Sequence, residues 1–243
     1  MRAGLAGALL AGLIGAAPAV AQDALIVKST VAKYRVGTKI KADTEIILES
    51  GDVISVLVKG GTRTMRGPGS FVAGANPKNN RMRFANLTRK NAAAKDGTGG
   101  VRAPSADGEG RPPNPNIYYI DVDRSGPICL RDLDEVVFWR PYNVEAATYT
   151  LSEVAPEDTG QTLSLTIPFG TESDLGFIDV NSFALKDKTS YTIAGPDGVK
   201  GAAITIIDLG GDIRAADELG DALIENGCMT QFEILADRLT PGD

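Results

Sequence analysis

Short runs of β-branched and aliphatic residues, separated by polar turns, form the main pattern in the first half of the chain. The run at residues 53–58 is preceded by Gly51-Asp52 and followed by Gly60-Gly61. Runs of this length between such turns are typical of β-hairpins, because glycine accepts the backbone conformation of a tight turn. The pattern predicts a small, mainly antiparallel sheet, with strands near residues 25–27, 45–49, 53–58 and 62–65.

The second half continues the strand pattern and adds a single predicted helix. This helix is placed at residues 213–226, with Asp212 as its N-cap and Asn226-Gly227 as its end. The alternation of the other segments is typical of a β-sandwich. The sequence therefore predicts an all-β, mainly antiparallel fold with one C-terminal helix. The strands of this second, sandwich-like module are expected at residues 117–120, 128–130, 136–139, 147–151, 162–167, 190–193, 203–207 and 230–234.

A polar segment at residues 91–116 separates the two halves. It is rich in Gly, Pro, Ala, Asp and Asn and has almost no large apolar side chain. Such a segment buries too little surface to offset the entropy of ordering, so a flexible linker is predicted. Its three prolines, Pro112, Pro113 and Pro115, favour an extended end. The predicted modules are then residues 22–90 and 117–243.

The first 21 residues have the pattern of a cleavable secretory signal peptide. Arg2 precedes an uncharged apolar run that ends in Ala19-Val20-Ala21, an A-x-A cleavage site. A membrane anchor is the alternative, but the apolar part is shorter than the ~20 residues that a bilayer span needs. We therefore expect a periplasmic protein without a transmembrane segment in its mature chain.

The two cysteines and the absence of histidine limit the chemistry. The 243 residues include no histidine, which excludes Ser-His-Asp and Cys-His catalysis and imidazole metal sites. In an oxidising compartment Cys129 and Cys228 are expected to form a disulfide. A nucleophilic or metal-binding cysteine is the alternative, but no C-x-x-C spacing supports it.

Charge is distributed unevenly along the chain, whose formal net charge is −6. Residues 22–87 carry eleven Lys or Arg against five Asp or Glu, whereas residues 117–243 carry eight against twenty-three. Three explanations fit this asymmetry: the modules have different partners, they attract each other, or each simply has a solvated surface.

The first module resembles the FecR-like module of periplasmic proteins from Gram-negative bacteria. The resemblance covers about residues 24–72 and rests on Leu48-Glu49-Ser50-Gly51-Asp52 and on the segment GTRTMRGPGSF at residues 61–71. The second half is similar to uncharacterised secreted companions of such modules, in residues 119–122, 125–129 and 138–141. The resemblance implies a β-rich periplasmic interaction module without known catalysis. Anti-sigma activity is not implied, because the membrane span and cytoplasmic tail of the FecR regulators have no counterpart here.

Basic residues of the first module form the first candidate site. Guanidinium groups displayed on a sheet can bind phosphates or carboxylates through two hydrogen bonds. In the envelope the available partners are lipopolysaccharide, teichoic-like polymers, peptidoglycan carboxylates or the edge of a periplasmic protein; nucleic acid is not expected. Ordinary solvated side chains are the alternative, since no aromatic residues interleave the bases. The candidate residues are Arg35, Lys41, Arg63, Arg66, Arg81 and Arg83.

A second candidate site is a partial calcium-loop pattern. Alternating oxygen ligands around a turn glycine suit a hard cation, and Asp121, Asp123, Ser125 and Asp132 follow this order. Asp at the last position, an internal proline and flanking strands favour a plain hairpin turn instead. Trp139 is either a sugar-binding platform or a core residue beside the disulfide. A calcium-dependent carbohydrate-binding module is thus the second functional hypothesis.

Catalysis is not predicted. Without histidine only a Ser–Lys pair or paired carboxylates remain, and Ser182 and Lys186 are spaced i, i+4 instead of S-x-x-K. A histidine-free hydrolase is therefore the third and least favoured hypothesis. The sequence predicts a secreted, non-catalytic envelope-binding protein without a cofactor.

Overall fold

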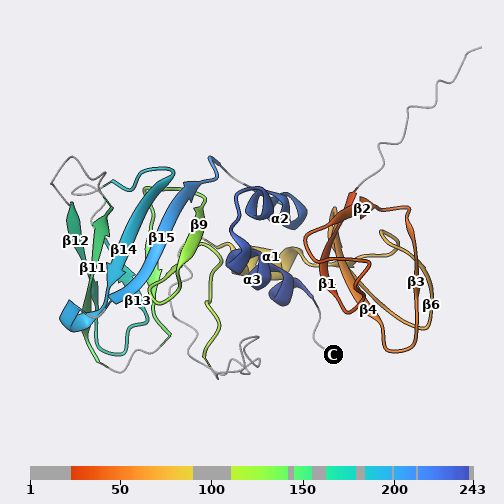
Figure 1. Ribbon diagram of the computed structural model, residues 1–243, viewed down its shortest axis with the longest axis horizontal. Helices are drawn as coiled ribbons and strands as arrows, with labels where there is room; N and C mark the ends of the chain where they lie inside the picture. Colours follow the sequence, from red (N-terminus) through yellow and green to blue (C-terminus); the bar gives the residue numbers. More distant parts are fainter. Residues whose placement is uncertain are drawn as a thin grey trace, which may run out of the picture.

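The computed structural model describes residues 23–89, 111–141, 145–154, 163–178, 184–198, 200–211 and 213–240. The predicted signal peptide, residues 91–110 of the predicted linker, Ser182 and Asp212 lie outside these ranges. Within them, the helices are all too short or too polar to cross a bilayer. The predicted all-β, mainly antiparallel fold is confirmed, and the strands form two β units with helices between them (Figure 1).

The N-terminal β unit combines a five-stranded antiparallel sheet with a two-stranded ribbon. The sheet has the order β2-β1-β4-β5-β7, and the ribbon pairs β3 with β6. The predicted hairpins are present, and Gly51 and Gly60 have φ angles of 91° and 90° at their turns. The strands are β1 (Asp23–Ser29), β2 (Lys39–Lys41), β3 (Glu45–Leu48), β4 (Val53–Val58), β5 (Gly61–Arg66), β6 (Gly69–Val72) and β7 (Lys78–Asn79).

Strand alternation gives the N-terminal unit two apolar faces. Ile54 and Val56 point toward the ribbon and pack with Ile46 in one core. Leu25 and Leu57 belong to a different core, on the opposite face of the sheet. That second face needs a cover from elsewhere in the chain.

The C-terminal β unit is one eight-stranded sheet that curls into a nearly closed barrel. The strand pattern predicted a sandwich-like module, but a single curled sheet takes the place of two facing sheets, because alternation along a strand does not specify how the sheet closes. Its order is β8-β10-β13-β12-β11-β14-β15-β9, so the two outermost strands are consecutive in the chain. The β8–β10 and β9–β15 pairs are parallel, and the other pairs are antiparallel. The strands are β8 (Ile120–Asp121), β9 (Gly126–Leu130), β10 (Val137–Trp139), β11 (Ala147–Glu153), β12 (Ser164–Phe169), β13 (Leu175–Phe177), β14 (Thr189–Ala194) and β15 (Lys200–Asp208).

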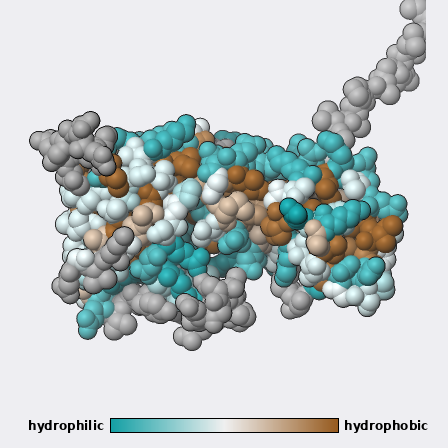
Figure 2. All heavy atoms as spheres, in the orientation of Figure 1, coloured by the Kyte–Doolittle hydropathy of each residue, from teal (hydrophilic) through white to brown (hydrophobic). Residues whose placement is uncertain are grey.

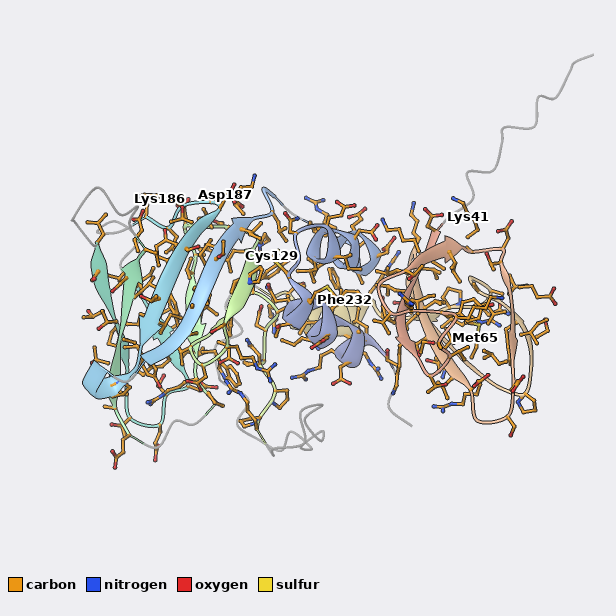
Figure 3. All side chains as sticks on the ribbon, viewed as in Figure 1. Lys41, Met65, Cys129, Lys186, Asp187 and Phe232 are labelled. Atoms are coloured by element: carbon orange, nitrogen blue, oxygen red, sulfur yellow. A yellow bond between two sulfur atoms is a disulfide. The ribbon has the colours of Figure 1, made fainter. Side chains whose placement is uncertain are left out.

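Three helices form a layer between the β units: α1 (Arg81–Leu87), α2 (Ala216–Glu225) and α3 (Met229–Leu239) (Figure 1). Their apolar faces share one core with Leu25 and Leu57 of the N-terminal unit and with Ile117 and Cys129 of the C-terminal unit. Phe232 is fully buried in this layer (Figure 3). The helices therefore cover the second face of the N-terminal sheet.

The predicted helix at residues 213–226 corresponds to α2, and Gly227 ends it with a φ of 72°. The predicted strand at residues 230–234 is wrong, because α3 occupies this segment. The strand was predicted because Phe232 and Ile234 alternate with polar residues. In the structure the buried residues Phe232, Leu235 and Leu239 follow a helical period. The predicted strand at residues 117–120 is reduced to β8.

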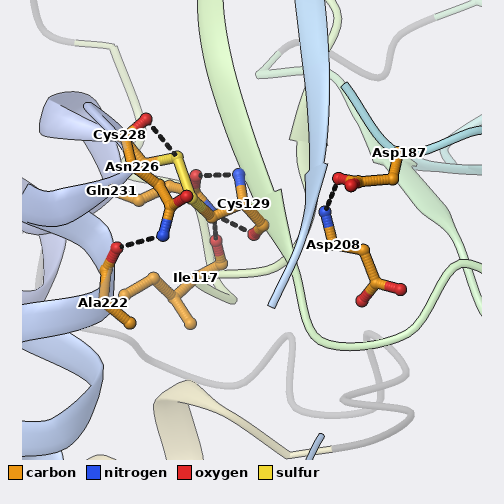
Figure 4. The surroundings of a disulfide bond; sticks show 8 residues. All are labelled: Ile117, Cys129, Asp187, Asp208, Ala222, Asn226, Cys228 and Gln231. Carbon is orange, nitrogen blue, oxygen red and sulfur yellow. Dashed lines mark hydrogen bonds between the residues drawn. A yellow bond between two sulfur atoms is a disulfide. The ribbon is translucent and has the colours of Figure 1, made fainter. Parts of the chain in front are cut away.

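The predicted disulfide is confirmed. Cys129 on β9 is bonded to Cys228, which lies between α2 and α3, with their Cα atoms 6.0 Å apart (Figure 4). Beside it, the buried Gln231 accepts a hydrogen bond from the Cys129 amide and donates to the carbonyls of Cys129 and Ile117, each at 2.7 Å. This network fixes the start of α3 on the C-terminal unit.

The last residues of the predicted linker form hydrogen bonds with the folded units, whereas its three prolines are exposed. Asn114 donates to the Tyr119 carbonyl at 2.9 Å, and Asn116 donates to the Arg89 carbonyl at 2.8 Å. Both asparagines are buried, and the Ile117 amide bonds the carbonyl of Leu87 at the end of α1. The β units are therefore connected by direct packing as well as by residues 91–110.

Candidate functional site

The basic residues of the N-terminal unit lie mostly in a segment that contains no acid. Residues 53–89 include seven Lys or Arg and no Asp or Glu. The structure places this segment in β4 to β7 and α1. This acid-free run is a signal in the sequence that sets Arg35 and Lys41 apart from the other predicted bases.

The short helix α1 displays bases because its apolar residues fix its orientation. Phe84 and Leu87 are buried in the helical layer, which leaves Arg81 and Arg83 exposed on either side of Met82. Met82 is 81% exposed. We call the exposed bases along this segment the basic helix surface; they are Lys78, Arg81, Arg83 and Arg89.

The other predicted bases lie on other elements of the N-terminal unit. The Lys41 ammonium bonds Asp23 at 2.7 Å and, with its charge, lowers the pKa of that carboxyl. Arg63 donates to the Ala75 carbonyl. Arg66 is three residues farther along β5 than Arg63, so the two side chains point to opposite faces. Arg35 is exposed between β1 and β2.

The four residues of the predicted calcium loop do not converge on one point. Asp121 is paired with Arg111 and lies 3.6 Å from Arg124. The Ser125 hydroxyl accepts the Ala203 amide at 3.0 Å, and Asp132 accepts the Asp134 amide at 2.8 Å. Across the described ranges, groups of three acidic or cysteine side chains suited to a metal ion are absent.

Asp121 lies buried at the edge of a cleft. Its burial raises the pKa of the carboxyl, and the hydrogen bond from the Asp123 amide and the charge of Arg111 oppose this shift. The cleft has a volume of about 210 Å³ and lies between Arg111, the β8–β9 connection and α3, whose Glu233 and Asp237 also line it. Arginines thus neutralise the carboxylate that was expected to bind calcium.

Trp139 does not present an open face in this cleft. It is 3% exposed, and the Arg111 guanidinium lies 5.6 Å from the centre of its ring. It packs with Tyr119 and Leu175 in a small cluster that is separate from the core containing the disulfide. Trp139 is therefore a core residue, as one of the two interpretations predicted, but its cluster is not the one beside the disulfide.

A second hollow lies where the end of α1 meets the C-terminal unit. Its volume is about 190 Å³. Arg131 donates to the Thr88 carbonyl at 3.3 Å, and its guanidinium lies 5.4 Å from the centre of the Tyr118 ring. We call this hollow the arginine pocket; its lining residues include Arg89, Tyr118, Tyr119, Arg131, Asp134, Glu135 and Phe177.

The arginine pocket was not predicted from the sequence, because its walls come from three segments that are far apart along the chain. Arg131 follows β9, Phe177 ends β13, and Arg89 follows α1. The sequence suggested Trp139 as the aromatic platform for a sugar. In the structure Trp139 is buried, and the exposed aromatic side chain of the pocket is Phe177, which is 56% exposed.

Comparisons with known proteins leave these sites without a named precedent. Neither a protein-family model, a curated protein nor a solved structure matches the chain. The resemblance to the FecR-like module therefore stays a prediction, based on the residues given for it above.

Proposed function

We propose that this is a secreted, non-catalytic binding protein whose basic helix surface holds an anionic polymer of the cell envelope. The observation that carries the proposal is the exposure of Arg81 and Arg83 in an acid-free segment. Among the described residues neither guanidinium has a side-chain partner, so both can bind phosphate or carboxylate groups. Met82 between them offers a flexible apolar contact for the polymer backbone.

Two observations support export to the periplasm. The apolar pattern of residues 1–21 is that of a signal peptide. The Cys129–Cys228 disulfide suits an oxidising compartment. There, the polyanions expected from the sequence are lipopolysaccharide, teichoic-like polymers and peptidoglycan carboxylates, and a basic surface would be attracted to them.

Ion pairs within the protein make two other bases weaker candidates for polymer binding. Lys39 forms an ion pair with Asp221 of α2 at 2.9 Å, and Lys41 is paired with Asp23. The Lys39–Asp221 pair joins the two units. It supports the explanation that the charge asymmetry serves in part to attract the units to each other. Among the bases that these pairs leave for a polymer, we favour those of the basic helix surface, because they are exposed and lie in the acid-free segment 53–89.

The test is equilibrium binding of the purified protein to polygalacturonate and to long-chain polyphosphate at low salt. Arg81→Gln/Arg83→Gln should weaken binding about tenfold, since each exposed charge contact contributes about 0.5–1 kcal/mol. Lys186→Gln/Lys188→Gln removes the same charge from the C-terminal unit and should have little effect. The proposal is wrong if the wild-type protein binds neither polymer, or if both double variants bind equally well.

A further inference from the structure

The arginine pocket adjoins the basic helix surface, which makes it part of the same track. Arg131 is bonded to the carbonyl of Thr88, the C-cap of α1. The next residue, Arg89, belongs to the basic helix surface and also lines the pocket. A polymer that lies along α1 therefore reaches this pocket through Arg89.

The pocket contains the guanidinium of Arg131, which is held in one orientation and still has a hydrogen-bond donor that no described residue uses. The Tyr118 ring and the Thr88 carbonyl fix the position of Arg131. Its Nε–H is buried and has no acceptor among the described residues. A guanidinium held in this way is pre-organised for a carboxylate.

Acidic groups on the rim restrict what kind of anion fits. Asp134 and Glu135 line the pocket together with the two arginines. Their carboxylates repel a ligand that carries only negative charge, but they accept hydrogen bonds from hydroxyl groups. The suitable ligand therefore has both an anionic group and hydroxyl donors, which polyphosphate lacks along its length.

One wall of the pocket is aromatic and exposed. Phe177 at the end of β13 is 56% exposed, and Tyr119 and Val137 continue the apolar lining. The C–H face of a sugar ring packs against such a surface while its hydroxyls face polar groups. A volume of about 190 Å³ is small beside the sites of drug-sized ligands, ~300–1,000 Å³, and suits a single ring.

We infer that the arginine pocket binds one acidic sugar residue, with its carboxylate at Arg131 and Arg89 and its ring against Phe177. This inference rests on the proposed function and names the polymer as a carboxylated polysaccharide. The basic helix surface supplies attraction for any polyanion, and the pocket supplies preference for the sugar acid.

Binding of a galacturonate oligomer and of polyphosphate to the Phe177→Ala variant tests this inference. We expect a loss of at least about fivefold in affinity for the oligomer and no change for polyphosphate. Leu163→Ala, which removes another exposed side chain (54%) from the same unit, should change neither affinity. Because Phe177 is exposed, its loss leaves the fold intact, and melting temperature checks this.

Arg131→Lys separates pocket geometry from charge. Lysine keeps the charge but cannot provide the planar pair of donors, so the galacturonate oligomer should bind more weakly and polyphosphate equally well.

The outcomes separate the two proposals. Unchanged oligomer affinity in Phe177→Ala, together with weaker binding in Arg81→Gln/Arg83→Gln, overturns the pocket assignment and leaves the proposed function standing. Binding of polyphosphate alone by the wild-type protein also overturns the pocket assignment. Binding of neither polymer overturns both proposals.

Discussion

The two β units bury their sheets in different ways. The C-terminal sheet curls on itself, so that residues such as Phe138 and Tyr191 fill its own interior. The N-terminal sheet has a ribbon over one face, whereas its other face, with Leu25 and Leu57, is covered by α2 and α3 from the end of the chain. The smaller, basic unit therefore depends on the larger, acidic one to cover one face of its sheet. Because α1 packs in the same layer, the proposed binding surface is positioned by that shared core.

The surfaces of the units differ as well. The outer face of the β3–β6 ribbon carries Ile47 and Val72, which are 73% and 43% exposed, at an end of the molecule where hydrophobic residues gather (Figure 2). The outward positions of the C-terminal strands β12 and β14 are largely polar, as at Ser164, Thr166, Ser190 and Thr192.

Removing the disulfide should have the largest effect on this arrangement. The bond closes a loop of 99 residues, so Cys129→Ala/Cys228→Ala should lower the free energy of unfolding by about 4–5 kcal/mol in the chain-entropy model. Urea unfolding of the oxidised protein and the variant measures this. Reduction of the wild-type protein should give the same loss, and a loss below about 1 kcal/mol would contradict the role of the bond in holding the helices.

Phe232→Ala should break the dependence of one unit on the other. A fully buried phenylalanine contributes about 3–5 kcal/mol, and its loss here loosens the layer between the units. Hydrogen exchange should then accelerate in β1 and β4. Phe138→Ala, a matched truncation inside the barrel, should accelerate exchange mainly in the C-terminal strands. Equal patterns for the two variants would show that the units are not distinct.

Asp121→Asn should change how the stability of the protein depends on pH. Burial raises the pKa of Asp121 above its ordinary value of 3.8, so the folded state binds more protons in the window that begins there. The stability of the wild-type protein relative to the variant should therefore fall as pH rises through this window. Urea unfolding of both proteins from about pH 3.5 to about pH 6 measures the difference. If the stability of the wild-type protein relative to the variant instead grew with pH, burial would not be what sets the pKa of Asp121.

The Lys39–Asp221 pair between the units should have the smallest effect. Its side chains are 43% and 37% exposed, so the coupling energy in a double-mutant cycle of Lys39→Gln and Asp221→Asn should be about 0.2–1 kcal/mol. This coupling should decrease in high salt. A larger, salt-independent coupling would mean that this ion pair, and not apolar packing, joins the units.

Local signals predicted the features that depend on neighbouring residues. The hairpins follow from glycines at residues 51 and 60, and the end of α2 follows from Gly227. The disulfide followed from the number of cysteines and the inferred compartment. The parallel pairing of β15 with β9 and the cover over Leu25 depend on contacts between distant segments, which no local pattern specifies.

The candidate sites were predicted less well for the same reason. Arg81 and Arg83 were identified by residue type, but only the burial of Phe84 and Leu87 shows that both bases face outward. Asp121 fitted a calcium pattern because its arginine partners Arg111 and Arg124 are not part of that motif. Short α1 was missed because seven residues give too little periodicity to detect.

The salt dependence of polygalacturonate binding tests the central claim most directly, by comparing the basic and the acidic unit. A plot of the logarithm of the association constant against that of salt concentration should fall steeply for the wild-type protein, because bound counterions are released. For Arg81→Gln/Arg83→Gln the slope should become shallower by roughly two, one for each lost contact. For Lys186→Gln/Lys188→Gln it should not change. Equal slopes for the wild-type protein and the Arg81/Arg83 variant would contradict the claim that α1 carries the binding surface.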